Sequence, residues 1–130
     1  MAERPLSPHI TVYRWGYTMT LSILHRLSGV ALALALIGLV VWLTGASLGP
    51  KAYGALLPWL MSLPAKLLIA LAVTALIYHF CNGLRHLAWD MGWGFERAAA
   101  RRSAALVVAV SVIGAALCIY FIFCPGHGAA

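Results

Sequence analysis

Three long stretches of this sequence contain no Asp, Glu, Lys or Arg: residues 27–50, 67–84 and 103–130. Each is rich in Ala, Leu, Val and Ile, and each approaches or exceeds the roughly 20 residues that an α-helix needs to cross a bilayer core. Charged residues make up only 9% of the chain, against about 25% in a soluble domain. These features predict an integral membrane protein and exclude a water-soluble globule and a disordered chain.

The 130 residues are predicted to form a single all-α membrane domain after a short N-terminal cytoplasmic segment. Its three transmembrane helices are expected over residues 21–48, 66–90 and 103–124. Between the first two, Pro58 and Pro64 predict a loop or a broken interfacial piece over residues 51–66, with one helical turn around residues 56–61. A chain of this length has no room for a water-soluble catalytic domain, so any large chemistry must be shared with partners.

Basic residues are distributed unevenly between the two ends of the predicted helices. One end has Arg4, Arg14, Arg26, Arg85, Arg97, Arg101 and Arg102, and the other has Lys51 and Lys66. This ratio of seven to two predicts a cytoplasmic N-terminus and a periplasmic C-terminus in a bacterial inner membrane, or an N-terminus in the matrix in a mitochondrial inner membrane. Topology accounts for most of the positive charge, which suits anionic lipid and acidic protein partners rather than nucleic acid.

A polar stripe opens the first predicted helix. Helical spacing of i, i+3, i+4 and i+7 puts four residues on one face: Ser22, His25, Arg26 and Gly29. A hydroxyl and a guanidinium at the membrane rim can donate hydrogen bonds to a carbonyl oxygen of a lipid-soluble ligand, and can stabilise negative charge that develops on it during reduction. The alternative is that Arg26 extends to lipid phosphate and a neighbour satisfies His25, and spacing alone favours neither interpretation.

A second polar stripe lies near the end of the second predicted helix. Its members are His79, Asn82, Gly83, His86 and Asp90. Because ionisable groups at membrane depth are costly, they are expected to face a protein interior. His79 lies deeper than His86, and the nearby glycine leaves room for a flat, bulky group, which predicts a haem iron ligand. The alternative is a buried histidine with a structural role.

Helix geometry limits how His79 and His86 can act. Axial nitrogens on opposite sides of one iron are about 4 Å apart, whereas seven residues of helix span about 10.5 Å. The two histidines therefore cannot ligate the same haem. If His79 binds iron, the opposite ligand is His25 or a residue of a second protein, and His86 and Arg85 become candidates for the haem propionates.

The cysteines exclude several other kinds of site. Cys81, Cys118 and Cys124 form no C-x-x-C or C-x-x-C-H pattern, which argues against a disulfide framework, a zinc ribbon and a covalently attached c-type haem. We expect all three to be buried as small hydrophobic residues.

Three motifs occur in order along the chain. They are Arg4-Pro5-Leu6-Ser7-Pro8-His9, Ser22-x-x-His25-Arg26-x-Ser28-Gly29 and His79-x-x-Asn82-Gly83-Leu84-Arg85-His86-Leu87-x-Trp89-Asp90. Together they resemble the cytochrome b large membrane-anchor subunits of succinate dehydrogenase (succinate:quinone oxidoreductase, respiratory complex II). The resemblance covers essentially the whole chain, and it is closest to the mitochondrial and alphaproteobacterial branch. Each motif is modest alone, but their order and spacing are specific.

The resemblance implies partners and cofactors. In that family, two small membrane subunits anchor a flavoprotein subunit and an iron–sulfur subunit in the lipid bilayer, and they hold haem b and a ubiquinone site. His79 matches the axial haem ligand, with the opposite histidine supplied by the small membrane-anchor subunit. His86 and Arg85 match positions near the haem propionates. Such a chain belongs to an enzyme complex but does not itself oxidise succinate.

The resemblance also implies a quinone site. Ser22 and Arg26 match the quinone-site positions, and His25 matches a histidine close to both the quinone and a haem propionate. Electrons from the iron–sulfur subunit would reduce ubiquinone there.

Three alternatives remain open from the sequence. One is the anchor of a quinol:fumarate reductase, which runs the same reaction in reverse. Another is a structural anchor without haem. The third, a small transporter or channel subunit, is disfavoured because the polar groups gather at one membrane edge and the outer halves of the spans are almost wholly apolar.

Overall fold

The computed structural model describes residues 15–124, so the opening motif from Arg4 to His9 lies outside the described residues. Within this range the regular elements are four α-helices: α1 (Tyr17–Ser47), α2 (Pro50–Leu60), α3 (Leu63–Asp90) and α4 (Arg97–Phe123). By length and composition, α1, α3 and α4 can each cross a membrane. The prediction of an all-α membrane protein with three long apolar helices is confirmed.

Two helix boundaries differ from the predicted ones by several residues. Helix α1 starts at Tyr17, four positions before residue 21. Helix α4 starts at Arg97 and includes Arg101 and Arg102, because its first turns consist of Ala and Arg, which are strong helix formers. A helix can therefore extend beyond the charge-free stretch from which its span was predicted.

Helix α2 corrects the prediction of a loop between the first two spans. Pro50 occupies the first turn of α2 and Pro64 the first turn of α3, where a proline costs no hydrogen bond because the amides there have no partner within the helix. Pro58 lies inside α2, but close to its end, so few hydrogen bonds follow it. Of the two prolines interpreted as helix breakers, Pro64 marks a helix start and Pro58 lies inside a helix.

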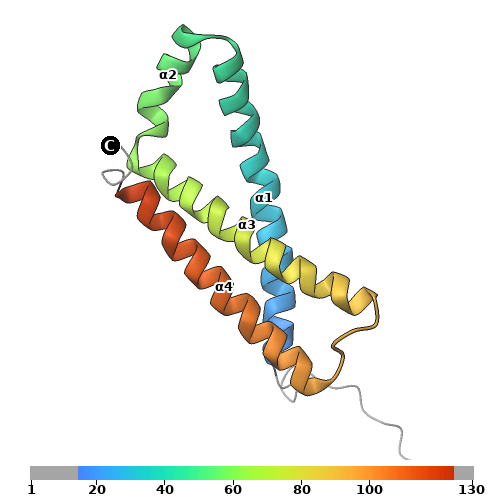
Figure 1. Ribbon diagram of the computed structural model, residues 1–130. Coiled ribbons are helices and arrows are strands. Elements are labelled where there is room, and N and C mark those ends of the chain that lie inside the picture. The colour runs from blue at the N-terminus through green and yellow to red at the C-terminus, as the bar shows by residue number, and fades with distance from the viewer. Residues whose placement is uncertain (1–14, 125–130) are drawn as a thin grey trace, which may run out of the picture.

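The long helices form a pair with a third helix across it (Figure 1). Helices α3 and α4 lie side by side and antiparallel, and α1 crosses α3. The far end of α1 diverges from α3, and α2 connects them. On α4, the buried residues are Ala104, Val107, Ser111 and Ala115. Such small side chains allow two helix backbones to approach closely, which is how helices associate in a membrane.

Most of the large apolar side chains are exposed on this chain. In the most apolar stretch of α1, none of the residues is buried, and exposed Leu, Ile and Val side chains surround the helix. Helices that are apolar on all faces fit lipid or partner helices, not water. The structure thus agrees with a membrane location.

The three cysteines differ in how far they are buried. Cys81 and Cys118 are half-buried and Cys124 is exposed, and none of the three forms a disulfide. The expectation of burial is therefore wrong for Cys124, which caps the end of α4.

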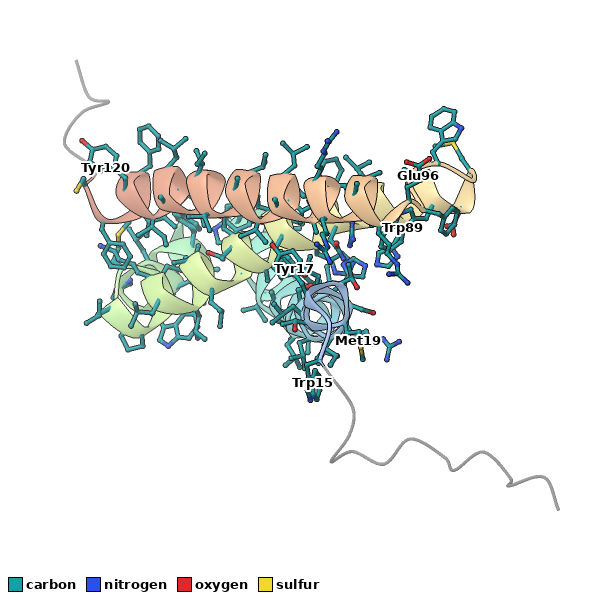
Figure 2. All side chains as sticks on the ribbon, turned by 90° about the horizontal axis from the view of Figure 1, so that it is seen from below. Trp15, Tyr17, Met19, Trp89, Glu96 and Tyr120 are labelled. Carbon is teal, nitrogen blue, oxygen red and sulfur yellow. The ribbon has the colours of Figure 1, made fainter. Side chains whose placement is uncertain are left out.

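Figure 2 shows Trp89 beside the connection between α3 and α4, and Tyr120 at the opposite end of α4. Aromatic side chains at both ends of a span are typical of membrane–water interfaces.

Candidate functional site

The crossing of α1 and α3 brings two predicted site residues into contact. The imidazole rings of His25 and His79 stack with centroids 4.0 Å apart and planes inclined by 13°. Gly29 permits this approach, because a Cβ there would lie 3.1 Å from Cε1 of His79. On α3, a Cβ at Gly83 would lie 3.9 Å from Cε1 of His25, so the glycine of each helix faces the histidine of the other.

His86 completes what we call the histidine cluster: His25, His79 and His86. Its ring centroid lies 5.1 Å from that of His25, with the planes tilted by 36°, and 5.2 Å from that of Trp89, which it meets edge to face. In the part of the chain that the structure describes, no three His, Cys, Asp or Glu side chains are arranged to hold a metal ion. The cluster is thus an assembly of rings at a helix crossing.

Hydrogen bonds fix the protonation of His79. The hydroxyl of Ser28 donates to the carbonyl oxygen of His25 at 2.8 Å, and its oxygen lies 3.0 Å from Nδ1 of His79. The same Nδ1 lies 3.2 Å from the carbonyl of His25. Because a carbonyl only accepts, the contact between Nδ1 of His79 and the His25 carbonyl is a hydrogen bond when Nδ1 carries the hydrogen, and the Ser28 oxygen can accept from the same group. In the neutral ring, Nε2 then carries the lone pair.

A tyrosine that sequence reasoning missed holds the same crossing together. The hydroxyl of Tyr78 on α3 donates to the carbonyl of Leu21 on α1 at 2.7 Å, and Leu21 is 3% exposed. Tyr78 immediately precedes His79, so this bond sets the position of α1 against α3 next to the histidine cluster. In the sequence, Tyr78 is noticeable only as a ring with a hydroxyl within an apolar run. A buried hydroxyl of this kind needs a hydrogen-bond partner, but the sequence does not identify that partner.

The predicted quinone residues lie beside the cluster on α1. Ser22 is half-buried and Arg26 is exposed, while His25 between them turns toward α3. The Nδ1 atom of His25 is buried and has no hydrogen-bond partner among the described residues. A buried polar atom without a partner is costly in a finished structure, so this part of the cluster is not fully satisfied by the described residues.

Arg85 and Asn82 lie apart from the histidines, toward α4. The guanidinium of Arg85 donates from Nε to Oγ of Ser103 at 3.0 Å, from Nη1 to Oδ1 of Asn82 at 3.4 Å and from Nη2 to the carbonyl of Ala100 at 3.1 Å. It also lies 4.0 Å from the ring centroid of Trp89. Arg85 therefore joins α3 to α4, and its predicted role at a propionate stays a prediction.

The division of α3 into two polar faces follows from helix geometry. Each residue turns the chain by about 100°, so His86 lies only about 20° from the direction of His79, whereas Asn82 lies about 60° to one side and Gly83 about 40° to the other. Asn82 is fully buried and bonds to Arg85, so it belongs to the α4 side. The single stripe expected from the sequence is thus two neighbouring faces with different partners.

Comparisons with known proteins identify the family. Residues 1–118 match the family described as succinate dehydrogenase/fumarate reductase transmembrane subunit. The succinate dehydrogenase cytochrome b556 subunit of Rickettsia felis is 38% identical over 111 residues, which cover 85% of this chain and 86% of that protein. The corresponding subunit of Paracoccus denitrificans is 37% identical over 124 residues, covering 93% and 95%.

A mitochondrial relative is equally similar. The succinate dehydrogenase cytochrome b560 subunit of Mus musculus is 39% identical over 119 residues, which cover 86% of this chain and 68% of that protein. The bacterial and mitochondrial matches agree with the branch to which the three motifs pointed. The chain belongs to the succinate dehydrogenase cytochrome b subunits, within the family of succinate dehydrogenase/fumarate reductase transmembrane subunits.

Proposed function

We propose that this chain is the large anchor subunit of a succinate:ubiquinone oxidoreductase and that it holds haem b through His79. The observation that carries the proposal is the hydrogen bonding of His79, whose Nδ1 is held by Ser28 and by the His25 carbonyl. Metal-bound histidines typically donate their second ring nitrogen to such an acceptor. His79 therefore has the hydrogen bonds expected of an iron ligand, and Nε2 is the atom proposed to bind iron.

The opposite iron ligand is proposed to come from the small anchor subunit. If His25 and His79 held one iron between them, each would have to turn a ring nitrogen toward it. The rings of His25 and His79 are instead stacked face to face, an arrangement with no room for a porphyrin plane between them. This supports a ligand from another protein and leaves His25 available for a propionate or for quinone.

Haem b, when bound, takes up and releases single electrons. Around it this chain supplies hydrogen-bond donors. His25, whose ring is half-buried, and His86, on the same face as His79, are proposed to hydrogen-bond the propionate carboxylates. The structure gives Arg85 other partners on α4, so its part is proposed to be the positioning of α3, with no direct bond to the haem.

Ser22 and Arg26 are proposed to bind ubiquinone together with partner residues. A hydroxyl and an always-charged guanidinium are both donors, and the negative charge that develops on a quinone oxygen during reduction strengthens their hydrogen bonds. Arg26 is exposed, so this part of the site is completed by the iron–sulfur subunit, which delivers the electrons. With the proposed cytoplasmic or matrix orientation, protons have a short path from water.

The first test is a visible difference spectrum, dithionite-reduced minus air-oxidised, of the detergent-purified complex that contains this chain. We expect a b-type band together with succinate-dependent ubiquinone reduction. A complex that is fully assembled and reduces quinone but has no such band would instead be a structural anchor without haem, and the assignment of His79 would be wrong.

Arg85 offers a separate prediction, because its contacts with α4 support a role in packing and not in haem binding. Arg85→Ala removes three hydrogen bonds from a side chain that is 6% exposed. Hydrogen bonds to charged groups contribute about 1.5–3 kcal/mol each, so we expect a clear loss of thermal stability of the purified complex. The amount of haem per assembled complex should stay unchanged at low temperature.

The matched control for this variant is Arg102→Ala, which removes an exposed arginine near the same end of α4. It should leave the melting temperature close to that of the unmodified complex. If Arg85→Ala lost haem without loss of thermal stability, Arg85 would be a propionate ligand, and the packing role argued from its α4 contacts would be wrong.

A further inference from the structure

We propose that Ser28 is a positioning residue for the haem ligand. It fixes the tautomer and the orientation of His79 and sets how strongly this ring donates electrons to iron. The inference rests on the proposed function of His79 and goes beyond it, because it assigns a role to a side chain to which the proposed function gives none. The residue lies in the first helix, whereas the histidine that it positions lies in the third.

The Ser28 hydroxyl is itself held in one orientation. Its hydrogen is directed to the carbonyl of His25, three residues earlier in the same helix, at 2.8 Å. The residue is 8% exposed, so within this chain little water competes for the hydroxyl. With the hydrogen fixed toward His25, the oxygen lone pairs are left for the neighbouring helix, where Nδ1 of His79 lies 3.0 Å away.

Steric contacts alone do not determine which ring nitrogen of His79 faces α1. The stacked His25 ring limits its tilt, and Gly29 lies against Cε1, but a flipped imidazole has nearly the same shape. Two acceptors, the Ser28 oxygen and the His25 carbonyl, converge on Nδ1. Only a ring with hydrogen on Nδ1 satisfies both, and that ring presents its lone pair at Nε2.

The same bonds have an electronic consequence. An Nδ1–H group that donates to an acceptor makes the other nitrogen a stronger base, and a more basic ligand favours the more positively charged oxidation state of the iron. Removal of the Ser28 acceptor is therefore expected to shift the haem midpoint potential to a more positive value. Loss of such outer partners typically weakens metal binding by about 10- to 100-fold.

The test compares Ser28→Ala with the unmodified chain in the whole purified complex. Two quantities are measured: the haem midpoint potential in an optical redox titration, and the haem retained after incubation with excess apomyoglobin. We expect a more positive potential and faster loss of haem. The matched control is Ser47→Ala, because Ser47 makes the same bond to a carbonyl three residues earlier in α1, Thr44 at 2.8 Å, but lies far along the helix from His79.

A second pair of variants separates the hydroxyl from the space it fills. Ser28→Thr keeps an acceptor oxygen. The valine of Ser28→Val has nearly the same shape as that threonine but lacks the oxygen. The proposal requires the Val variant to have the more positive potential and the faster haem loss of the two. Equal values for this pair, or a shift to lower potential on removal of the hydroxyl, would overturn the role of Ser28.

These outcomes are distinguishable from a failure of the proposed function. If a variant without the His79 imidazole kept its haem, the ligand assignment itself would be wrong. If that variant lost its haem while Ser28→Ala and the Thr and Val pair matched the unmodified complex in both measurements, only the inference about Ser28 would be wrong.

Discussion

Replacement of His79 by Ala is expected to abolish the b-type band of the purified complex. The imidazole is the group on α3 whose Nδ1 is held by two acceptors and whose Nε2 is left to bind iron, and alanine offers no replacement ligand. The measurement is the dithionite-reduced minus air-oxidised spectrum, normalised to the flavin of the complex so that loss of haem is distinguished from loss of assembly. The expected loss is complete, because one axial bond is removed outright.

His86→Ala is the matched control for this experiment. It removes the same kind of ring from the same face of α3, about two turns further along, where it contacts His25 and Trp89. Because His86 cannot share an iron with His79, its loss should leave the band in place, with at most a change in haem potential from altered propionate contacts. A band that survived in His79→Ala and vanished in His86→Ala would exchange the two roles.

The long helices were predictable because their composition leaves few other structures open. An uncharged run of apolar residues must satisfy its backbone hydrogen bonds internally in lipid, which a helix does. Helix α2 was not predictable from Pro58 and Pro64, because a proline forbids a hydrogen bond inside a helix but is favourable in the first turn. Pro64 lies in the first turn of α3, whereas Pro58 lies inside α2, near its end.

The candidate site was predictable as a face but not as a set of contacts. The seven-residue spacing put His79 and His86 on one side of α3, and the structure has them there. The spacing did not reveal that Ser28 bonds to His79, because helical periodicity describes one helix at a time. Asn82 was misplaced for a related reason. It lies about 60° from His79 around the axis of α3, and its bond is to Arg85, which contacts α4.

Arg26→Leu is expected to lower succinate-dependent ubiquinone reduction by about 100- to 1000-fold, the typical effect of removing one donor to a developing oxyanion. Leucine keeps the apolar stem but supplies neither charge nor hydrogen-bond donor at the edge of the histidine cluster. Reduction of an artificial dye by the soluble subunits should be unchanged, because those electrons leave before they reach this chain. The two rates are measured on the same purified preparation, and their ratio is the result.

Two further variants show what the guanidinium contributes. Arg26→Lys keeps the charge but not the planar fork of donors, so it should give an intermediate rate if both charge and geometry act on the quinone. Arg101→Leu removes an exposed arginine of α4 and should leave both rates unchanged, which controls for a general effect of lost positive charge. If quinone reduction survived in Arg26→Leu, this side chain would be a lipid anchor, and the quinone would have to be bound by Ser22, His25 and the partner subunits without it.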